Sequence, residues 1–101
     1  MSWIRARLRV TDDMDFQFVF IRRPTGRWLI GVEQPDSAMY KSKKRASDSY
    51  TTHRLFDQVS KAPGLATICF SAPISTLAEA RAVARAWSEG TVEYFATGDR
   101  F

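Results

Sequence analysis

Residues 16–22 read "FQFVFIR" and residues 3–10 read "WIRARLRV". In both stretches an apolar residue occupies every second position, which is the pattern of a β-strand with one buried face. The polar stretch "TDDMD" at 11–15 separates them, and aspartate is a common turn residue. The two stretches therefore predict an antiparallel pair of strands joined by a turn.

A third strand is predicted at 27–33, "RWLIGVE", after a turn at 24–26, "PTG". Proline suits the first central position of such a turn, and glycine suits the left-handed position that follows. An odd-length first turn and a three-residue second turn would set the register of this meander. We expect the cross-strand pairs Val10–Phe16, Leu8–Phe18, Ala6–Phe20, Ile30–Phe20 and Val32–Phe18.

The predicted sheet has two unlike faces. The first is apolar and is expected to be the core face; it carries Ile4, Ala6, Leu8, Val10, Phe16, Phe18, Phe20, Trp28, Ile30 and Val32. The second is a basic row beside an apolar strip, with Trp3, Arg5, Arg7, Arg9, Gln17, Val19, Ile21 and Leu29. The sequence leaves open which face the helices cover, and whether the apolar strip belongs to a homodimer interface.

The second half of the chain predicts two helices and two strands. A helix over 52–61 would place Leu55, Phe56 and Val59 on one face, and "APG" at 62–64 would end it. A strand is predicted over 65–70. Thr76 and Glu79 have the spacing of a capping box, which begins a second helix, and Gly90 fits its C-terminal cap. A last strand is predicted over 91–96.

This order, β-β-β-α-β-α-β, predicts a two-layer α+β fold with helices on one face of a mostly antiparallel sheet. If its strands were parallel, the last strand–helix–strand unit would form a right-handed crossover. A chain of 101 residues suits one domain, residues 1–101. Residues 34–50, "QPDSAMYKSKKRASDSY", lack periodicity and predict a long exposed basic loop.

Composition favours an ordinary globular protein, with 45% hydrophobic and 26% charged residues. A net charge of +4 favours an anionic partner. The single cysteine, Cys69, lies in "ATICF" and is expected to be a small buried side chain. Arginines stand where a signal peptide would be apolar, and no apolar run reaches the roughly 20 residues of a membrane span. We therefore expect a cytoplasmic protein.

The sequence shows no motif for catalysis or for metal binding. His53 is the only histidine, so a familiar zinc set is missing, and a nucleophile pair with Cys69 would need a buried thiol to reach the imidazole. The aspartates of "TDDMD" lack the glycine and distal glutamate of a calcium loop. We expect no cofactor, no metal and no enzymatic activity.

Basic residues form three clusters in which aromatic side chains are interspersed. The candidate partner-binding residues are Trp3, Arg5, Arg7, Arg9, Arg22, Arg23, Arg27, Tyr40, Lys41, Lys43, Lys44 and Arg45. Arginine with aromatic side chains can bind phosphates and bases, and is also typical of protein–protein hot spots. The alternative is an ordinary solvated surface whose arginines pair with acids such as Glu93.

These features predict a small basic, non-enzymatic binding protein that docks on a macromolecular partner. By analogy with small proteins of phages and mobile elements, it would be an inhibitor or adaptor acting on a nucleic-acid-handling protein complex. The alternative is direct binding of nucleic acid by the basic sheet face and the lysine loop. Against it, the acidic residues are numerous and most aromatic residues are predicted to face the core.

Overall fold

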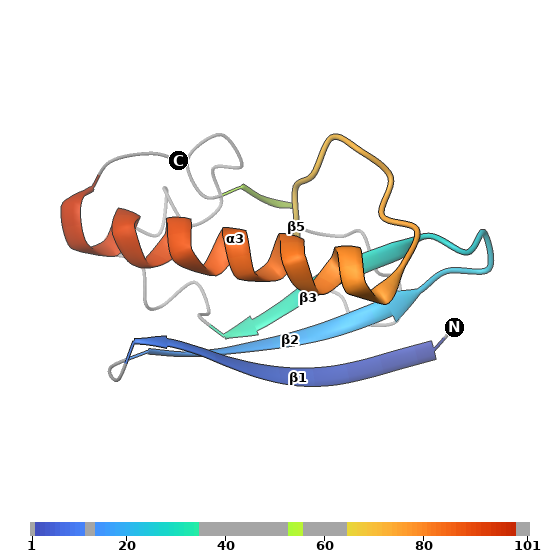
Figure 1. Ribbon diagram of the computed structural model, residues 1–101, viewed down its shortest axis with the longest axis horizontal. Helices are drawn as coiled ribbons and strands as arrows, with labels where there is room; N and C mark the ends of the chain where they lie inside the picture. Colours follow the sequence, from blue (N-terminus) through green and yellow to red (C-terminus); the bar gives the residue numbers. More distant parts are fainter. Residues whose placement is uncertain (1, 12–13, 35–52, 56–64, 99–101) are drawn as a thin grey trace.

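The computed structural model describes residues 2–11, 14–34, 53–55 and 65–98. Within them lie the strands β1 (Ser2–Thr11), β2 (Met14–Arg22), β3 (Trp28–Gln34), β4 (Arg54–Leu55) and β5 (Ala66–Ile68), followed by the helix α3 (Leu77–Thr97). The strands form one sheet in the order β1-β2-β3-β5-β4, and each neighbouring pair is antiparallel. Helix α3 lies along one face of this sheet (Figure 1), which confirms an α+β fold.

The register of β1 on β2 differs by two residues from the prediction. Leu8 pairs with Phe16, Ala6 with Phe18 and Ile4 with Phe20. The ladder continues to the pair Thr11–Met14, so the connection is shorter than the five-residue turn that the sequence suggested, and the register shifts after Arg9. A displacement of two residues keeps every side chain on its face, so the two predicted faces are retained.

The hairpin between β2 and β3 has the predicted register, with Phe20 opposite Ile30 and Phe18 opposite Val32. The backbone N–H of Gly26 donates a hydrogen bond to the carbonyl oxygen of Arg23 at 2.9 Å. Gly26 adopts φ 85°, a left-handed conformation that glycine reaches without a steric penalty. The "PTG" stretch therefore forms the tight turn that its residues indicate.

The main hydrophobic core lies between α3 and the apolar face of the sheet. Its buried members are Phe16, Phe18, Phe20, Ile30, Val32, Ile74, Ala80, Ala84 and Trp87. The ring of Trp87 meets both Phe16 and Phe18 edge-on, with ring centroids 6.1 Å apart in each pair. Edge-to-face contacts of this kind add to the area that the rings bury. At the sheet edge Ile4 is 36% exposed, although it was expected in the core.

Helix α3 begins as predicted and ends later than predicted. The Thr76 hydroxyl accepts a hydrogen bond from the Glu79 N–H at 3.1 Å, which confirms the cap. The helix then continues through Gly90 to Thr97 and is capped by Gly98, whose φ is 79°. The predicted cap at Gly90 and the predicted strand over 91–96 are therefore wrong, because Thr91 and Tyr94 extend the buried face of the helix at helical spacing.

The sheet is completed by two short strands. Arg54 and Leu55 form β4 and pair with Ile68 and Thr67 of β5, so the helix predicted over 52–61 is wrong at these two residues. Residues 52 and 56–61 lie outside the described part of the chain. The strand predicted over 65–70 is present in shortened form as β5, which runs antiparallel to β3. With residues 91–96 in α3, the predicted strand–helix–strand unit does not form.

The face opposite α3 carries a second, smaller core. Val19 and Ile21 are 1% and 0% exposed and pack with Trp3, Leu29 and Leu65. Gly31 allows Leu65 to approach closely, because a Cβ atom at Gly31 would lie 2.8 Å from the Leu65 Cδ2 atom. The apolar strip of this face is therefore internal packing, and it provides no argument for a homodimer.

Candidate functional site

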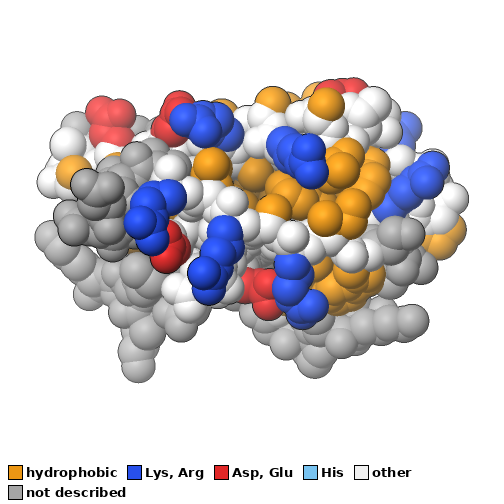
Figure 2. All heavy atoms as spheres, turned by 60° about the horizontal axis from the view of Figure 1, so that its bottom comes forward, with side chains coloured by type: hydrophobic (Ala, Val, Ile, Leu, Met, Phe, Trp, Pro, Cys, Tyr) orange, Lys and Arg blue, Asp and Glu red, His pale blue; other side chains and the backbone are white. Residues whose placement is uncertain are grey.

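Three arginines of β1 are exposed in one row. Arg5, Arg7 and Arg9 alternate with Ala6 and Leu8, so the pleat of the strand directs them to the face opposite α3. Figure 2 turns the β1 side of the molecule toward the reader, and basic side chains are spaced across this side beside a hydrophobic patch. The row is thus presented at the edge of the sheet.

Two of these arginines have acidic partners. The Arg5 Nε atom lies 3.2 Å from the Glu33 Oε1 atom, and the Arg9 Nε atom lies 2.9 Å from the Asp15 Oδ1 atom. Exposed pairs of this kind are screened by solvent and contribute little to stability, so they orient the side chains more than they stabilise the fold. Among the described residues, no carboxylate lies within ion-pair distance of Arg7. Arg7 therefore offers the most available charge of the row.

Asp15 is expected to titrate below its ordinary value. The hydrogen bond from Arg9, reinforced by the charges of Arg9 and Arg7, lowers the pKa of the Asp15 carboxyl below 3.8. The ionised pair thus favours the folded state above the ordinary pKa, and this contribution is lost as pH falls through the lowered pKa. An NMR titration should show the low pKa in the native chain and its return toward 3.8 in Arg9→Ala. Arg23→Ala is the control, and an Asp15 pKa at or above the ordinary value in the native chain would contradict the pairing.

The second cluster lies at the β2–β3 hairpin. Arg22, Arg23 and Arg27 are exposed, and the pair Ser2–Arg22 places this hairpin beside the start of β1. The hairpin cluster therefore lies at the Trp3 end of β1, whereas Arg9, opposite Asp15, lies toward the other end of the strand. Arg22 pairs with Trp28, which packs on the α3-side core, so Arg22 belongs to the opposite face from the row of Arg5, Arg7 and Arg9.

The described residues do not include the third predicted cluster. Tyr40, Lys41, Lys43, Lys44 and Arg45 lie outside the described residues, and their role stays a prediction. Arg54 is 2% exposed, so its side chain is buried and is not part of the basic surface. Trp3 packs on the core formed by Val19 and Ile21, and its ring is only partly available to a partner.

A hollow between β1 and α3 was missed by the sequence reasoning. It has a volume of about 220 Å³, and its lining consists of Ala6, Arg7, Leu8, Phe18, Phe20, Arg81, Ala84 and Arg85. The walls are mostly apolar, and Arg81 and Arg85 of α3 are the lining residues from the helix that carry charge. Arg85 also pairs with Glu89 at 3.3 Å. The spacing of Arg81 and Arg85 in "RAVAR" could have indicated that both lie together, because residues four apart lie on the same face of a helix.

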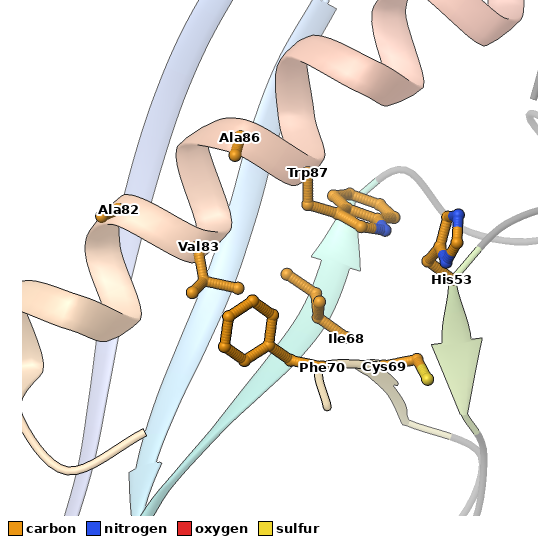
Figure 3. Close-up of a pocket in the computed structure, with 8 residues that line it drawn as sticks. All are labelled: His53, Ile68, Cys69, Phe70, Ala82, Val83, Ala86 and Trp87. Atoms are coloured by element: carbon orange, nitrogen blue, oxygen red, sulfur yellow. The ribbon is translucent and has the colours of Figure 1, made fainter. Parts of the chain in front are cut away.

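A larger apolar pocket of about 430 Å³ lies between α3 and the segment that follows β5. Figure 3 shows the Phe70 ring beneath Val83, with Trp87 and His53 farther along. Cys69 is exposed here, so the prediction of a buried thiol is wrong: the strand ends at Ile68. The Cys69 N–H donates to the His53 carbonyl oxygen at 2.7 Å, yet the thiol is directed away from the imidazole ring. This arrangement does not form a nucleophile pair.

The described ranges contain no group of three or more histidine, cysteine or acidic side chains that could hold a metal ion. In the same ranges, no helix has the length and apolar character needed to cross a membrane. Comparisons of the chain with protein-family models, with curated proteins and with solved structures find no match. Function is therefore inferred from the geometry of the molecule.

Proposed function

We propose that the protein is a small, non-enzymatic binding protein that docks on an acidic part of a partner protein through β1. The observation that carries the proposal is the exposed row of Arg5, Arg7 and Arg9 on the outermost strand of the sheet. Arginine is enriched at protein interfaces because its planar guanidinium can form two hydrogen bonds with a carboxylate. An acidic partner surface would complement this edge.

A protein partner is favoured over direct contact with nucleic acid. Binding of single-stranded nucleic acid uses exposed aromatic rings on which bases stack. Among the described residues near the arginine row, the aromatic rings take part in packing: Phe16, Phe18 and Phe20 are buried on one face, and Trp3 packs on the other. A nucleoprotein complex would present carboxylates and phosphates together. The proposed docking function therefore includes that of an inhibitor or adaptor of a nucleic-acid-handling complex.

Charge reversal at Arg7 should separate this site from the rest of the basic surface. The full chain would be used to capture partners from lysate, beside Arg7→Glu and the matched control Arg23→Glu at the hairpin. We expect the native chain and the control to retain one stoichiometric protein. Arg7→Glu should lose at least about tenfold in affinity for it, because the introduced glutamate would repel the carboxylates of the partner.

The same capture experiment is repeated after nuclease treatment and over a series of salt concentrations. A protein partner should remain bound after nuclease treatment. Capture that disappears with nuclease, together with binding of mixed-sequence DNA that falls steeply between about 50 and 200 mM salt, would instead support direct nucleic-acid binding. Equal losses in Arg7→Glu and Arg23→Glu would show that the docking site is not centred on β1.

A further inference from the structure

Strand β1 has an outer edge that no described strand pairs with. It is ten residues long and forms the end of the sheet order β1-β2-β3-β5-β4. In an antiparallel ladder, backbone N–H and C=O groups point alternately to the two sides of a strand, so half of those of β1 point away from β2. An extended segment of another chain can bind such an edge through main-chain hydrogen bonds.

The hollow between β1 and α3 would receive side chains from an added strand. Ile4, Ala6 and Leu8 face the α3 side of the sheet, and side chains of an added strand on that side would lie beside them. Ala6 is small and lines the hollow of about 220 Å³, while Ile4 is 36% exposed at the same edge. An apolar side chain opposite Ala6 would therefore cover exposed apolar surface.

The other side of an added strand would meet positive charge. Residues that face away from α3 would lie beside Arg5, Arg7 and Arg9. Opposite charges across neighbouring strands are stabilising, and like charges are destabilising. The complementary segment is therefore one in which acidic and apolar residues alternate.

The same charges argue against a second copy of this chain as the occupant. Two β1 strands that pair antiparallel about a two-fold axis keep their corresponding faces together. Arg5, Arg7 and Arg9 would then lie opposite the arginines of the second copy, with few acids between them. Charged residues on an edge strand are a common protection against such self-pairing.

We propose that β1 binds its partner by strand addition, with an acidic, extended segment whose alternate apolar side chains enter the hollow between β1 and α3. This inference rests on the proposed docking function and specifies its mode. It predicts that main-chain hydrogen bonds as well as charge hold the partner.

The test uses the full chain and a short synthetic peptide in which Glu and Leu alternate. Two twin peptides carry N-methyl groups, one on the Leu backbone nitrogens and the other on the Glu backbone nitrogens. Only one of these two sets can point toward β1, because N–H groups alternate between the edges of a strand. We expect the parent peptide to slow hydrogen exchange at alternate amides of β1. One twin should lose at least about tenfold in affinity while the other binds like the parent.

Arg7→Glu should weaken the binding of the parent peptide, and Arg23→Glu should leave this binding unchanged. Equal binding of all three peptides, with a loss in Arg7→Glu, would overturn strand addition but keep docking by charge. Failure of every peptide to bind would also overturn strand addition. The capture of a partner from lysate would then test the docking function separately. Protection of β1 amides without peptide, rising with protein concentration, would identify a second copy as the occupant.

Discussion

Phe18→Ala is expected to lower the free energy of unfolding by about 3–5 kcal/mol. Phe18 is 1% exposed and its ring contacts those of Phe16, Phe20 and Trp87, with centroids 6.2, 6.2 and 6.1 Å away. The substitution removes the central ring of this cluster and leaves a cavity that the rigid sheet cannot close. A domain of this size is stabilised by only about 5–15 kcal/mol, so the loss should be large in a urea titration.

Phe70→Ala is the matched control for this measurement. Phe70 is 50% exposed, so its removal should cost far less than the removal of Phe18. Similar urea midpoints for the two variants would contradict a core placed between β2 and α3. So would a loss of unfolding free energy below about 1 kcal/mol for Phe18→Ala.

Glu93→Pro is expected to cost about 3 kcal/mol or more. Glu93 is exposed and lies inside α3, where proline removes a backbone hydrogen bond and its ring clashes with the preceding turn. The effect separates the observed helix from a solvent-facing edge strand over the same residues, in which proline would be tolerated. Thermal unfolding followed by circular dichroism would report the change.

Ala78→Pro serves as the control within the same helix. Ala78 is exposed in the first turn of α3, where the N–H has no partner within the helix and proline is accepted. We expect this variant to unfold close to the native chain. Equal stability of Glu93→Pro and Ala78→Pro would mean that residues 91–97 do not form the helix seen here.

The period of two in residues 3–22 was enough to predict the faces of the sheet. Side-chain parity survives a register error of two residues, so Phe16, Phe18 and Phe20 were assigned correctly to the core face although each faces a different residue of β1 than expected. The error arose in the turn. The length of a connection depends on how far the ladder continues, and alternation does not determine where pairing ends.

The end of the chain was predicted less well, because local preference and tertiary packing disagree there. Thr91, Val92, Tyr94 and Phe95 are residues that favour strands, and Gly90 is a weak helix former. Burial of Thr91 and Tyr94 along the face of α3 prevails over these preferences. The cap at Thr76 was predictable because it depends only on two nearby residues.

The candidate site was only partly predictable for a similar reason. Alternation predicted that Arg5, Arg7 and Arg9 form one row, and the structure places them so. It also suggested an exposed apolar strip, but Val19 and Ile21 are buried beneath neighbours from distant parts of the sequence. The meeting of Arg81 and Arg85 with β1 depends on the position of α3 over the sheet, which no short motif encodes.

The claim that β1 is the docking surface is tested most directly by hydrogen–deuterium exchange on the complex with the captured protein partner. We expect slower exchange at alternate amides along β1 when the partner is bound, and unchanged exchange at the hairpin that contains Arg23. Slower exchange at the hairpin or at the pocket beside Phe70, with β1 unchanged, would contradict the account.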